Sequence, residues 1–501
     1  MFLESPFPCA ERPLPGAKLR SINPNKCGLF RLEPGTIRRA KINIYLHIEV
    51  LLRELDSRLL LAVLAASRDH KVFLADISSL QTAAKKGTLT PGVLLTKSLT
   101  PSEKKLIRHN VFQSQSIAIT SIDEESGLAN VSDYEVFSRQ RYSDDTLQQA
   151  SAAFCWGDED TEALKRVFPQ HASKIFKSGS PRVDLWRPRF REYWQEFAAK
   201  PGKPYLLVSS NMTANLTNPL HVTIQGMRKS GYFSRDEKEF YRLLGLVAEQ
   251  WKLIVAFAEA IENLSKKTSG FDIVLRPHPT ENTETWKALL HGMPNVHVIR
   301  EGGITSWVND AFAVMHNGCT TAFEATIAGT PALAYTPFPQ EYEMKAPNDL
   351  SKRISNPDEL VDEVTKIFDT HQASKGTIKD APSLPRALVE KIYIDEEELA
   401  ADKIIRVWES LEIEDEGKKT DWRRFRRVLI RKKIRSFPAM LFHALGGRSS
   451  QRSYSSQKFP GFDLSEIRAK VERLVGLLDV HDTIQVKRLS KTVILVKKVS
   501  G

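Results

Sequence analysis

The stretch AVMHNGCTTAFEATIAGTPALAYTP, residues 313–337, decides the fold class of this chain. It opens with an apolar run typical of a buried strand, and the following His-Asn-Gly triplet is typical of a turn. A helix is predicted to begin at Thr320 or Thr321, and we expect Gly329 to end it before a second strand that starts at Pro331. Strand, helix and strand in this order predict a parallel α/β unit, with the start of the helix at the carboxyl edge of the sheet.

The start of this helix is a candidate anion site. A hydroxyl at Thr320 or Thr321 can accept a hydrogen bond from the first backbone amides, and these amides, together with the helix dipole, favour a phosphate. Glu324 lies on the same helical face one turn later and can reach the ribose hydroxyls of a bound nucleotide. An ordinary capped helix explains the same residues equally well, so the motif needs support from elsewhere in the chain.

A second stretch, FDIVLRPHPTE at residues 271–281, supplies that support. A strand runs into an Arg-Pro-His-Pro element whose prolines fix the backbone, so that Arg276 and His278 are held at the end of the strand. Arginine offers a planar fork of donors and histidine can donate or be protonated, which together suit a diphosphate or a phosphodiester. A lone histidine is otherwise more often structural than a ligand.

The segments VLRPHPTE and HNGCTTAFEATIAGTPALAYTP together resemble the C-terminal domain of GT-B glycosyltransferases, and most closely the bacterial surface carbohydrate biosynthesis protein family. Three upstream segments extend the resemblance over residues 41–411: IEVLLRELDSRLLLAVLAASRDHKVFLA, SIDEESGLAN and KSGSPRVDLWRP. The resemblance implies an α/β fold of the GT-B type, in which two Rossmann-like doubly wound domains face a cleft. The His-Pro element is also similar to one in transferases that use CMP-activated Kdo or sialic acid, where it meets the CMP phosphate.

The bulk composition narrows the class of protein. At 501 residues the chain can hold two or three domains, and a formal charge of +11 indicates an anionic partner. The four cysteines are scattered and fit neither a zinc site nor a disulfide framework. No apolar run approaches the ~20 residues of a membrane span, and the first residues lack a secretion pattern, which favours a cytoplasmic location.

Residues 1–40 are expected to form a loose leader, and residues 41–199 a first, acceptor-side Rossmann-like domain. The first strand-to-helix turn of this domain carries Glu49, Arg53 and Glu54. Such a charged cluster either faces the cleft or forms ion pairs on a solvated helix. The family resemblance favours the cleft.

Three carboxylates, Asp123, Glu124 and Glu125, follow a later strand of the same domain. Packed carboxylates raise one another's pKa, so that one of them can act as a base near neutral pH. Sugar transfer needs a carboxylate either to deprotonate the acceptor hydroxyl or to attack the anomeric carbon, and we expect Glu124 or Glu125 in this role, followed by Asp123. The alternative is an ordinary solvated acidic loop.

Two further motifs close the first half of the chain. Asp158 and Asp160 have the Asp-x-Asp spacing of metal-dependent glycosyltransferases of another fold. They open a helix, however, where acidic residues are common, and GT-B enzymes generally need no metal, so we expect no metal site. The turn that ends at Arg182 either brings its guanidinium near the donor or is a plain interdomain loop.

A second Rossmann-like domain, which binds the nucleotide-sugar and ends in a return helix, is predicted over residues 200–411. Its first strand ends in two serines that are expected to face the cleft. The nucleotide- and phosphate-binding candidates of this domain are Ser209, Ser210, Arg276, His278, Asn317, Gly318, Thr320, Thr321 and Glu324.

Residues 412–459 form a basic amphipathic segment in which arginines and lysines alternate with apolar residues such as Phe425. Its central part, residues 418–437, suits the anionic inner face of a bacterial membrane, where lipid-linked acceptors reside. A solvated helix on the protein's own surface is the alternative. Nucleic acid is not expected, because no recognition motif is present. Residues 460–501 are predicted to form a small α/β cap.

Together with these patterns, the resemblance implies a metal-independent glycosyltransferase without a cofactor. It would move a sugar from a nucleotide donor to a surface polysaccharide or lipopolysaccharide acceptor, as a peripheral protein at the cytoplasmic membrane face. The resemblance puts a CMP-linked acidic sugar such as Kdo first among donors, a UDP-sugar second and a CDP-polyol third. A UDP-GlcNAc 2-epimerase-like enzyme and a non-catalytic nucleotide-binding assembly protein are the alternatives.

Overall fold

The computed structural model covers two sheets, their helices and a C-terminal hairpin. The predicted leader and most of the basic segment lie outside the described residues. Within the described ranges, none of the helices combines the length and the apolar character needed to cross a bilayer. The described residues are 41–129, 133–195, 200–212, 221, 224–225, 228, 237–278, 281–341, 343–374, 384–413, 424–428, 430 and 458–499.

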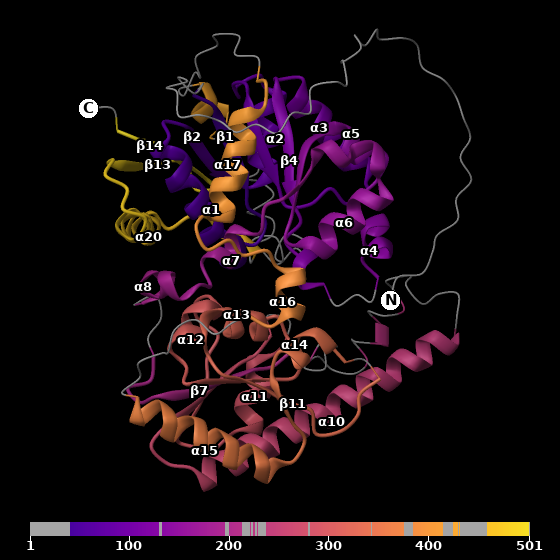
Figure 1. Ribbon diagram of the computed structural model, residues 1–501, viewed down its shortest axis with the longest axis vertical. Coiled ribbons are helices and arrows are strands. Elements are labelled where there is room, and N and C mark those ends of the chain that lie inside the picture. The colour runs from indigo at the N-terminus through magenta and orange to yellow at the C-terminus, as the bar shows by residue number, and fades with distance from the viewer. Residues whose placement is uncertain are drawn as a thin grey trace, which may run out of the picture. The chain divides into compact units, whose positions relative to one another are not determined.

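The first sheet has eight strands in the order β13 (Ile484–Ser490), β14 (Val493–Lys498), β2, β1, β3, β4, β5 and β6, and its strands β1 to β6 are parallel. Their bounds are β1 Asn43–His47, β2 Lys71–Ala75, β3 Gly92–Thr96, β4 Ile117–Ile122, β5 Ala150–Cys155 and β6 Ile175–Lys177. The helices between and after them, labelled in Figure 1, are α1 Leu51–Ser67, α2 Ile77–Lys85, α3 Glu103–Gln113, α4 Tyr134–Arg141, α5 Asp144–Gln149, α6 Asp158–Val167, α7 Pro181–Asp184 and α8 Arg191–Trp194.

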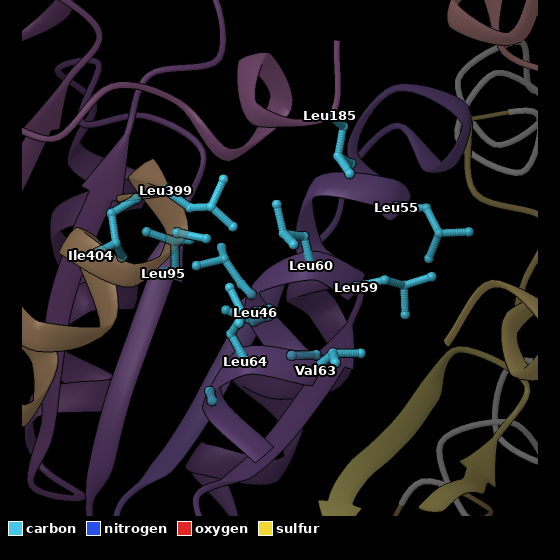
Figure 2. Packing of buried hydrophobic residues seen from close by; sticks show 14 of the residues in the cluster. Leu46, Leu55, Leu59, Leu60, Val63, Leu64, Leu95, Leu185, Leu399 and Ile404 are labelled. Carbon is cyan, nitrogen blue, oxygen red and sulfur yellow. The ribbon is translucent and has the colours of Figure 1, made fainter. Parts of the chain in front are cut away.

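The apolar run of α1 is the centre of this domain's core. Leu59 and Val63, one turn apart, are fully buried with Leu46 of β1 and Leu95 of β3 (Figure 2). Alternate residues of the same strands belong to a second cluster on the other face of the sheet, with α2, α3 and α5. Because each face is covered by helices, the sheet is doubly wound.

The second sheet has the order β12-β11-β10-β7-β8-β9, and all its pairings are parallel. Figure 1 shows α10 and α15 side by side, and the clusters place them on the face opposite α12 and α13. The strands are β7 Tyr205–Ser209, β8 Asp272–Arg276, β9 Val296–Val298, β10 Ala313–His316, β11 Ala332–Tyr335 and β12 Lys352–Ile354. The helices are α10 Glu237–Lys267, α11 Thr283–Leu289, α12 Ile304–Asp310, α13 Thr321–Ala328, α14 Lys345–Asp349, α15 Pro357–Ala373, α16 Arg386–Lys391 and α17 Ala400–Ser410.

The strand-helix-strand unit predicted over residues 313–337 is confirmed as β10, α13 and β11. Gly329 ends α13 in the left-handed conformation, with a φ of 76°, which glycine adopts without a Cβ penalty. Since β10 lies between β7 and β11, the start of α13 is at the carboxyl edge of the sheet and next to the end of β7.

Helix α17 returns from the second domain to the first. It packs on α1, and the Trp408 indole donates to the Thr120 hydroxyl of β4 at 3.1 Å. The Asp184 carboxylate accepts from the backbone amides of Ala400 and Ala401, at 3.2 and 3.1 Å, and so caps the start of α17. Two Rossmann-like domains in tandem with a returning helix form the GT-B architecture, which confirms the predicted fold class.

The C-terminal residues extend the first sheet. Helix α20 (Leu464–Leu477) precedes the hairpin of β13 (Ile484–Ser490) and β14 (Val493–Lys498), and β14 pairs antiparallel with β2. The described part of the basic segment lies against the same sheet. Phe425 is 1% exposed and contacts Phe73 of β2, with ring centroids 6.4 Å apart. This aromatic side chain therefore belongs to the protein's own core and is not available to a membrane, although Arg424, Arg426 and Arg427 beside it are exposed.

Candidate functional site

We call the turns that follow β7, β8 and β10 the second edge. Side-chain amides join two of these turns. The Asn317 side chain accepts from the backbone amide of Asn211 at 2.8 Å and donates to its carbonyl at 3.0 Å, and the Asn211 side chain donates to the carbonyl of Gly318 at 2.9 Å. The hydroxyls of Ser209 and Thr321 lie 3.0 Å apart. Four predicted residues, Ser209, Asn317, Gly318 and Thr321, are thus brought together in a neutral hydrogen-bonded network.

The start of α13 is not capped by a threonine hydroxyl. Thr320 has helical torsions, with a φ of −61° and a ψ of −16°, and its side chain accepts no bond from the helix, so the predicted cap is wrong. A capping residue needs an extended backbone to turn its oxygen toward the amides. The backbone amides of Cys319 and Thr320 donate no hydrogen bond to any described residue, so they remain available to an anion.

His316, at the end of β10, is a neutral part of this edge. Its Nδ1 accepts from the amide of Gly318 at 3.0 Å, and its Nε2 lies 2.7 Å from the Ser351 hydroxyl. Burial lowers the pKa of His316 to about 3. Gly318 has a φ of 88°, and a Cβ at this position would lie 3.0 Å from the Cβ of Met344, so a side chain here would be strained and crowded.

Arg276 lies at the end of β8, as predicted, but its guanidinium is bound to the protein's own backbone. It donates to the carbonyls of Glu301 and Gly302, both at 2.7 Å, and less closely to that of Arg300 at 3.4 Å. Burial lowers the pKa of Arg276 to about 10. Its observed contacts support the turn after β9, and the phosphate contact predicted for it stays a prediction.

Glu281 is a buried residue of the same loop to which the sequence assigned no role. One oxygen accepts from the Ser210 hydroxyl at 2.6 Å and from the Trp286 indole at 2.8 Å, and the other accepts from the amide of Met212 at 2.8 Å. Its own amide donates to the carbonyl of His278 at 2.8 Å. Glu281 therefore joins the loop that carries His278 to the end of β7. Burial lowers the pKa of His278, and the charge of Arg300 acts in the same direction.

Glu324 and Arg182, which the sequence placed in different domains, form an ion pair at 3.2 Å. The other carboxylate oxygen of Glu324 accepts from the Thr305 hydroxyl at 2.8 Å. Glu324 is 1% exposed, and burial raises its pKa against the opposing charge of Arg182. The ribose contact predicted for Glu324 stays a prediction.

We call the turns that follow β1, β3 and β4 the first edge. Here ion pairs between side chains hold the turns, whereas side-chain amides and hydroxyls join the turns after β7 and β10. Arg58 of α1 donates to Glu124 at 2.6 Å, and both side chains are buried. Glu54 accepts from the amide of Glu49 at 2.8 Å, and burial, with the nearby charge of Glu124, raises its pKa. Sequence reasoning missed Arg58, although it lies one turn after Glu54 on α1.

The three predicted catalytic carboxylates have different surroundings. Asp123 is fully buried and receives two hydrogen bonds of 2.8 Å from Arg141, and Glu124 is bound by Arg58. Glu125 has a side chain that is 55% exposed and lies 3.6 Å from both Arg53 and Arg141. Of these three carboxylates, only Glu125 is exposed enough to meet a substrate without unfolding its surroundings.

Glu49 lies between two lysines, with Lys97 at 2.6 Å and Lys458 at 3.2 Å. Burial acts to raise its pKa, but the hydrogen bonds and charges of these lysines hold it at about 2. The carboxylate of Glu49 is therefore ionised and already neutralised.

Asp160 stabilises the turn before α6. Its carboxylate accepts from the amides of Trp156 and Gly157, both at 2.9 Å. Among the residues that the structure describes, no group of three or more His, Cys, Asp or Glu side chains could hold a metal ion.

Comparison with known proteins gives structural likeness only. No family model matches the chain, and no curated protein matches its sequence. The UDP-GlcNAc 2-epimerase from Methanocaldococcus jannaschii is similar at 13% identity and a TM-score of 0.44, over 74% of this chain and 99% of that one. The corresponding enzyme from Neisseria meningitidis, bound to UDP-GlcNAc, is similar at 12% identity and a TM-score of 0.41, over 73% of this chain and 99% of that one. The wall teichoic acid polymerase TagF is similar at 11% identity and a TM-score of 0.44, over 75% of this chain and 91% of that one. Values this low assign neither activity nor substrate.

Proposed function

We propose that this protein is a GT-B glycosyltransferase that takes a sugar from a nucleotide donor and adds it to a glycan acceptor. The observation that carries the proposal is the pair of backbone amides, Cys319 and Thr320, at the start of α13. They have no acceptor among the described residues, and they lie at the carboxyl edge of a parallel sheet, where open α/β folds bind ligands.

The two edges suggest a division of roles. Neutral donors at the second edge would hold the donor phosphate and stabilise the charge that develops on the leaving nucleotide. Glu125 at the first edge would act on the acceptor hydroxyl as a base, because its carboxylate is the exposed one of the three, and Arg53 and Arg141, each 3.6 Å away, would hold it in place. Asp123 and Glu124 would position this turn.

For the donor we propose a CMP-linked acidic sugar such as Kdo first, then a UDP-sugar, then a CDP-polyol. This order of donors rests on the resemblance of the His-Pro element to that of CMP-sugar transferases. The contacts of Arg276 with backbone carbonyls do not favour any of the three donors. For the acceptor we propose a surface polysaccharide or lipopolysaccharide, reached at the inner face of the bacterial membrane.

The membrane part of the proposal rests on charge alone. Arg424, Arg426 and Arg427 are exposed, whereas Phe425 is buried in the protein, so binding to anionic lipid would be electrostatic and sensitive to salt. Changing the three arginines to glutamate should release the protein from anionic vesicles in a sedimentation assay. If the variant sediments as the wild type does, this part fails.

The nucleotide site is tested by thermal unfolding with CMP, CDP, UDP and GDP. A nucleotide that binds only the folded protein raises Tm, and at 100 times Kd the stabilisation is about 2.7 kcal/mol. Thr320→Glu places a negative charge beside the two amides and should abolish the shift. Thr320→Val has a similar shape without the charge and is the matched control, because the Thr320 side chain makes no hydrogen bond with the described residues.

The possible outcomes separate the hypotheses. A shift that survives in Thr320→Val and disappears in Thr320→Glu supports the site. The nucleotide that produces the largest shift identifies the donor class. Breakdown of the matching nucleotide-sugar only when an acceptor is present indicates a transferase, whereas conversion of the sugar without an acceptor indicates an epimerase. If no nucleotide changes Tm, the proposed function is wrong.

A further inference from the structure

Three cations at the first edge exceed the anionic groups available to them. Lys97 follows β3, and Lys105 and Arg108 lie in the first two turns of α3. Lys97 pairs with Glu49, which Lys458 also contacts. Among the described residues, the Lys105 ammonium donates only to the carbonyl and hydroxyl of Ser98, both at 3.1 Å. The Arg108 guanidinium forms no hydrogen bond or ion pair with any described residue.

The cations are near one another. The Lys105 ammonium experiences the charges of Arg108, Arg141 and Lys97, and burial together with these charges lowers its pKa to about 8. Asp123 and Glu49, the two carboxylates that oppose them, are each neutralised by closer partners, namely Arg141 at 2.8 Å and Lys97 at 2.6 Å. The local charge is therefore positive in the free protein.

The position of Lys105 on α3 is unfavourable without a ligand. The N-terminal end of a helix carries partial positive charge, so that a cation in its first turn, such as Lys105, is destabilising. All three cations are also partly buried, which costs solvation. A cluster that repels itself and is placed against a helix dipole becomes stable when an anion binds to it.

A buried polar atom lies at the same edge. Nδ1 of His47, the last residue of β1, has no hydrogen-bond partner among the described residues, and His47 is 5% exposed. β1 and β3 are neighbours with Leu46 opposite Leu95, so His47 is level with the residue before Lys97. The charges that act on its ring include Glu49, Arg108 and Lys97.

We propose that Lys97, Lys105 and Arg108 bind an oxyanion carried by the acceptor, a phosphate or a carboxylate, so that the enzyme extends a negatively charged glycan. This inference rests on the proposed transferase function, since it names the acceptor class for the same site. The oxyanion lies on the domain that also carries Glu125, and the donor phosphate lies on the other domain. A neutral acceptor would leave Lys105 and Arg108 without an ion-pair partner among the described residues.

Inorganic phosphate is the probe, titrated by calorimetry. All titrations use the Thr320→Glu background, so that phosphate cannot bind at the start of α13. The test variant carries Lys105→Gln and Arg108→Gln. The matched control carries Lys104→Gln, because Lys104 is exposed on the same helix and its removal also lowers the net charge. We expect the test variant to bind phosphate at least 10-fold more weakly and the control to bind it as the background does.

A second arm identifies the source of the anion. With Thr320 intact, Lys105→Gln/Arg108→Gln should bind the nucleotide found in the thermal panel within about twofold of wild type. A parallel loss of nucleotide affinity would assign the cations to the donor and overturn the inference. Equal phosphate affinity in the test and control variants, or no binding in the background, would also overturn it. The two phosphate results do not depend on whether a nucleotide binds at the second edge, so the two proposals can fail separately.

Discussion

The turns at the two carboxyl edges of this molecule are held together by different kinds of contact. The first edge is built from ion pairs, with Arg58 on Glu124, Arg141 on Asp123 and Lys97 on Glu49. At the second edge, side-chain amides and hydroxyls join the turns after β7 and β10, Glu281 accepts hydrogen bonds from neutral donors, and the buried His316 is neutral. Under the proposed function, the first domain would bind a charged acceptor and carry the proton transfer, and the second domain would hold the donor phosphate with backbone donors.

The largest expected effect is on catalysis. Glu125→Gln keeps the shape of the side chain and removes its basicity, and loss of a general base typically costs 10²–10⁴-fold in rate. Turnover of the nucleotide-sugar should fall by that amount while nucleotide affinity, measured by calorimetry, stays the same. Glu135→Gln removes a carboxylate that is paired with Arg166 in the same domain and should leave turnover unchanged. Equal rates in the wild type and Glu125→Gln would remove Glu125 from the mechanism.

The next effect is on stability and concerns the buried pair at the first edge. Arg58→Met leaves the carboxylate of Glu124 buried without a counter-charge, which should lower the free energy of unfolding by about 3–5 kcal/mol. A denaturant titration measures this change in the free energy of unfolding. Adding Glu124→Gln should recover part of the loss, because the second change removes the orphaned charge. No recovery would mean that Arg58 acts by packing alone.

The corresponding change at the second edge should cost less. Asn317→Ala removes both hydrogen bonds to the backbone of Asn211, and we expect a loss of about 1–2 kcal/mol in the same titration. A loss as large as that of Arg58→Met would contradict the distinction between turns held by a buried ion pair and turns held by neutral amides.

How far the sequence predicts these edges depends on how far apart along the chain the contacting residues lie. The β10-α13-β11 unit and the strand before Arg276 were predictable, because apolar runs, Gly329 and the prolines act locally. The carbonyl partners of Arg276 follow another strand, and the Arg58–Glu124 pair joins residues 66 positions apart. The C-terminal hairpin joins β2 more than 400 positions earlier. No local pattern specifies such pairings, although a charged residue on the apolar face of α1 could have identified Arg58.

The smallest effect concerns pH. The folded pKa of Lys105, about 8, is lower than the ordinary lysine value of about 10.4, so the folded state disfavours its charged form. This penalty is fully present below pH 8, decreases as the pH rises from 8 to about 10.4, and is absent above it. Wild type should therefore gain stability relative to Lys105→Gln over that window, by less than about 1 kcal/mol because the group is partly solvated. Parallel stability curves from denaturation at each pH would contradict the lowered pKa.

The most direct test of the account is a crossed titration of nucleotide and inorganic phosphate. Thr320→Glu should lose nucleotide binding and keep phosphate binding. Lys105→Gln/Arg108→Gln should keep nucleotide binding. When these two changes are made in the Thr320→Glu background, they should weaken phosphate binding by at least 10-fold. That crossed pattern is what two chemically distinct edges predict. Loss of both ligands in either variant, or of neither ligand in both, would contradict the assignment of the donor phosphate to the second edge and of the acceptor anion to the first.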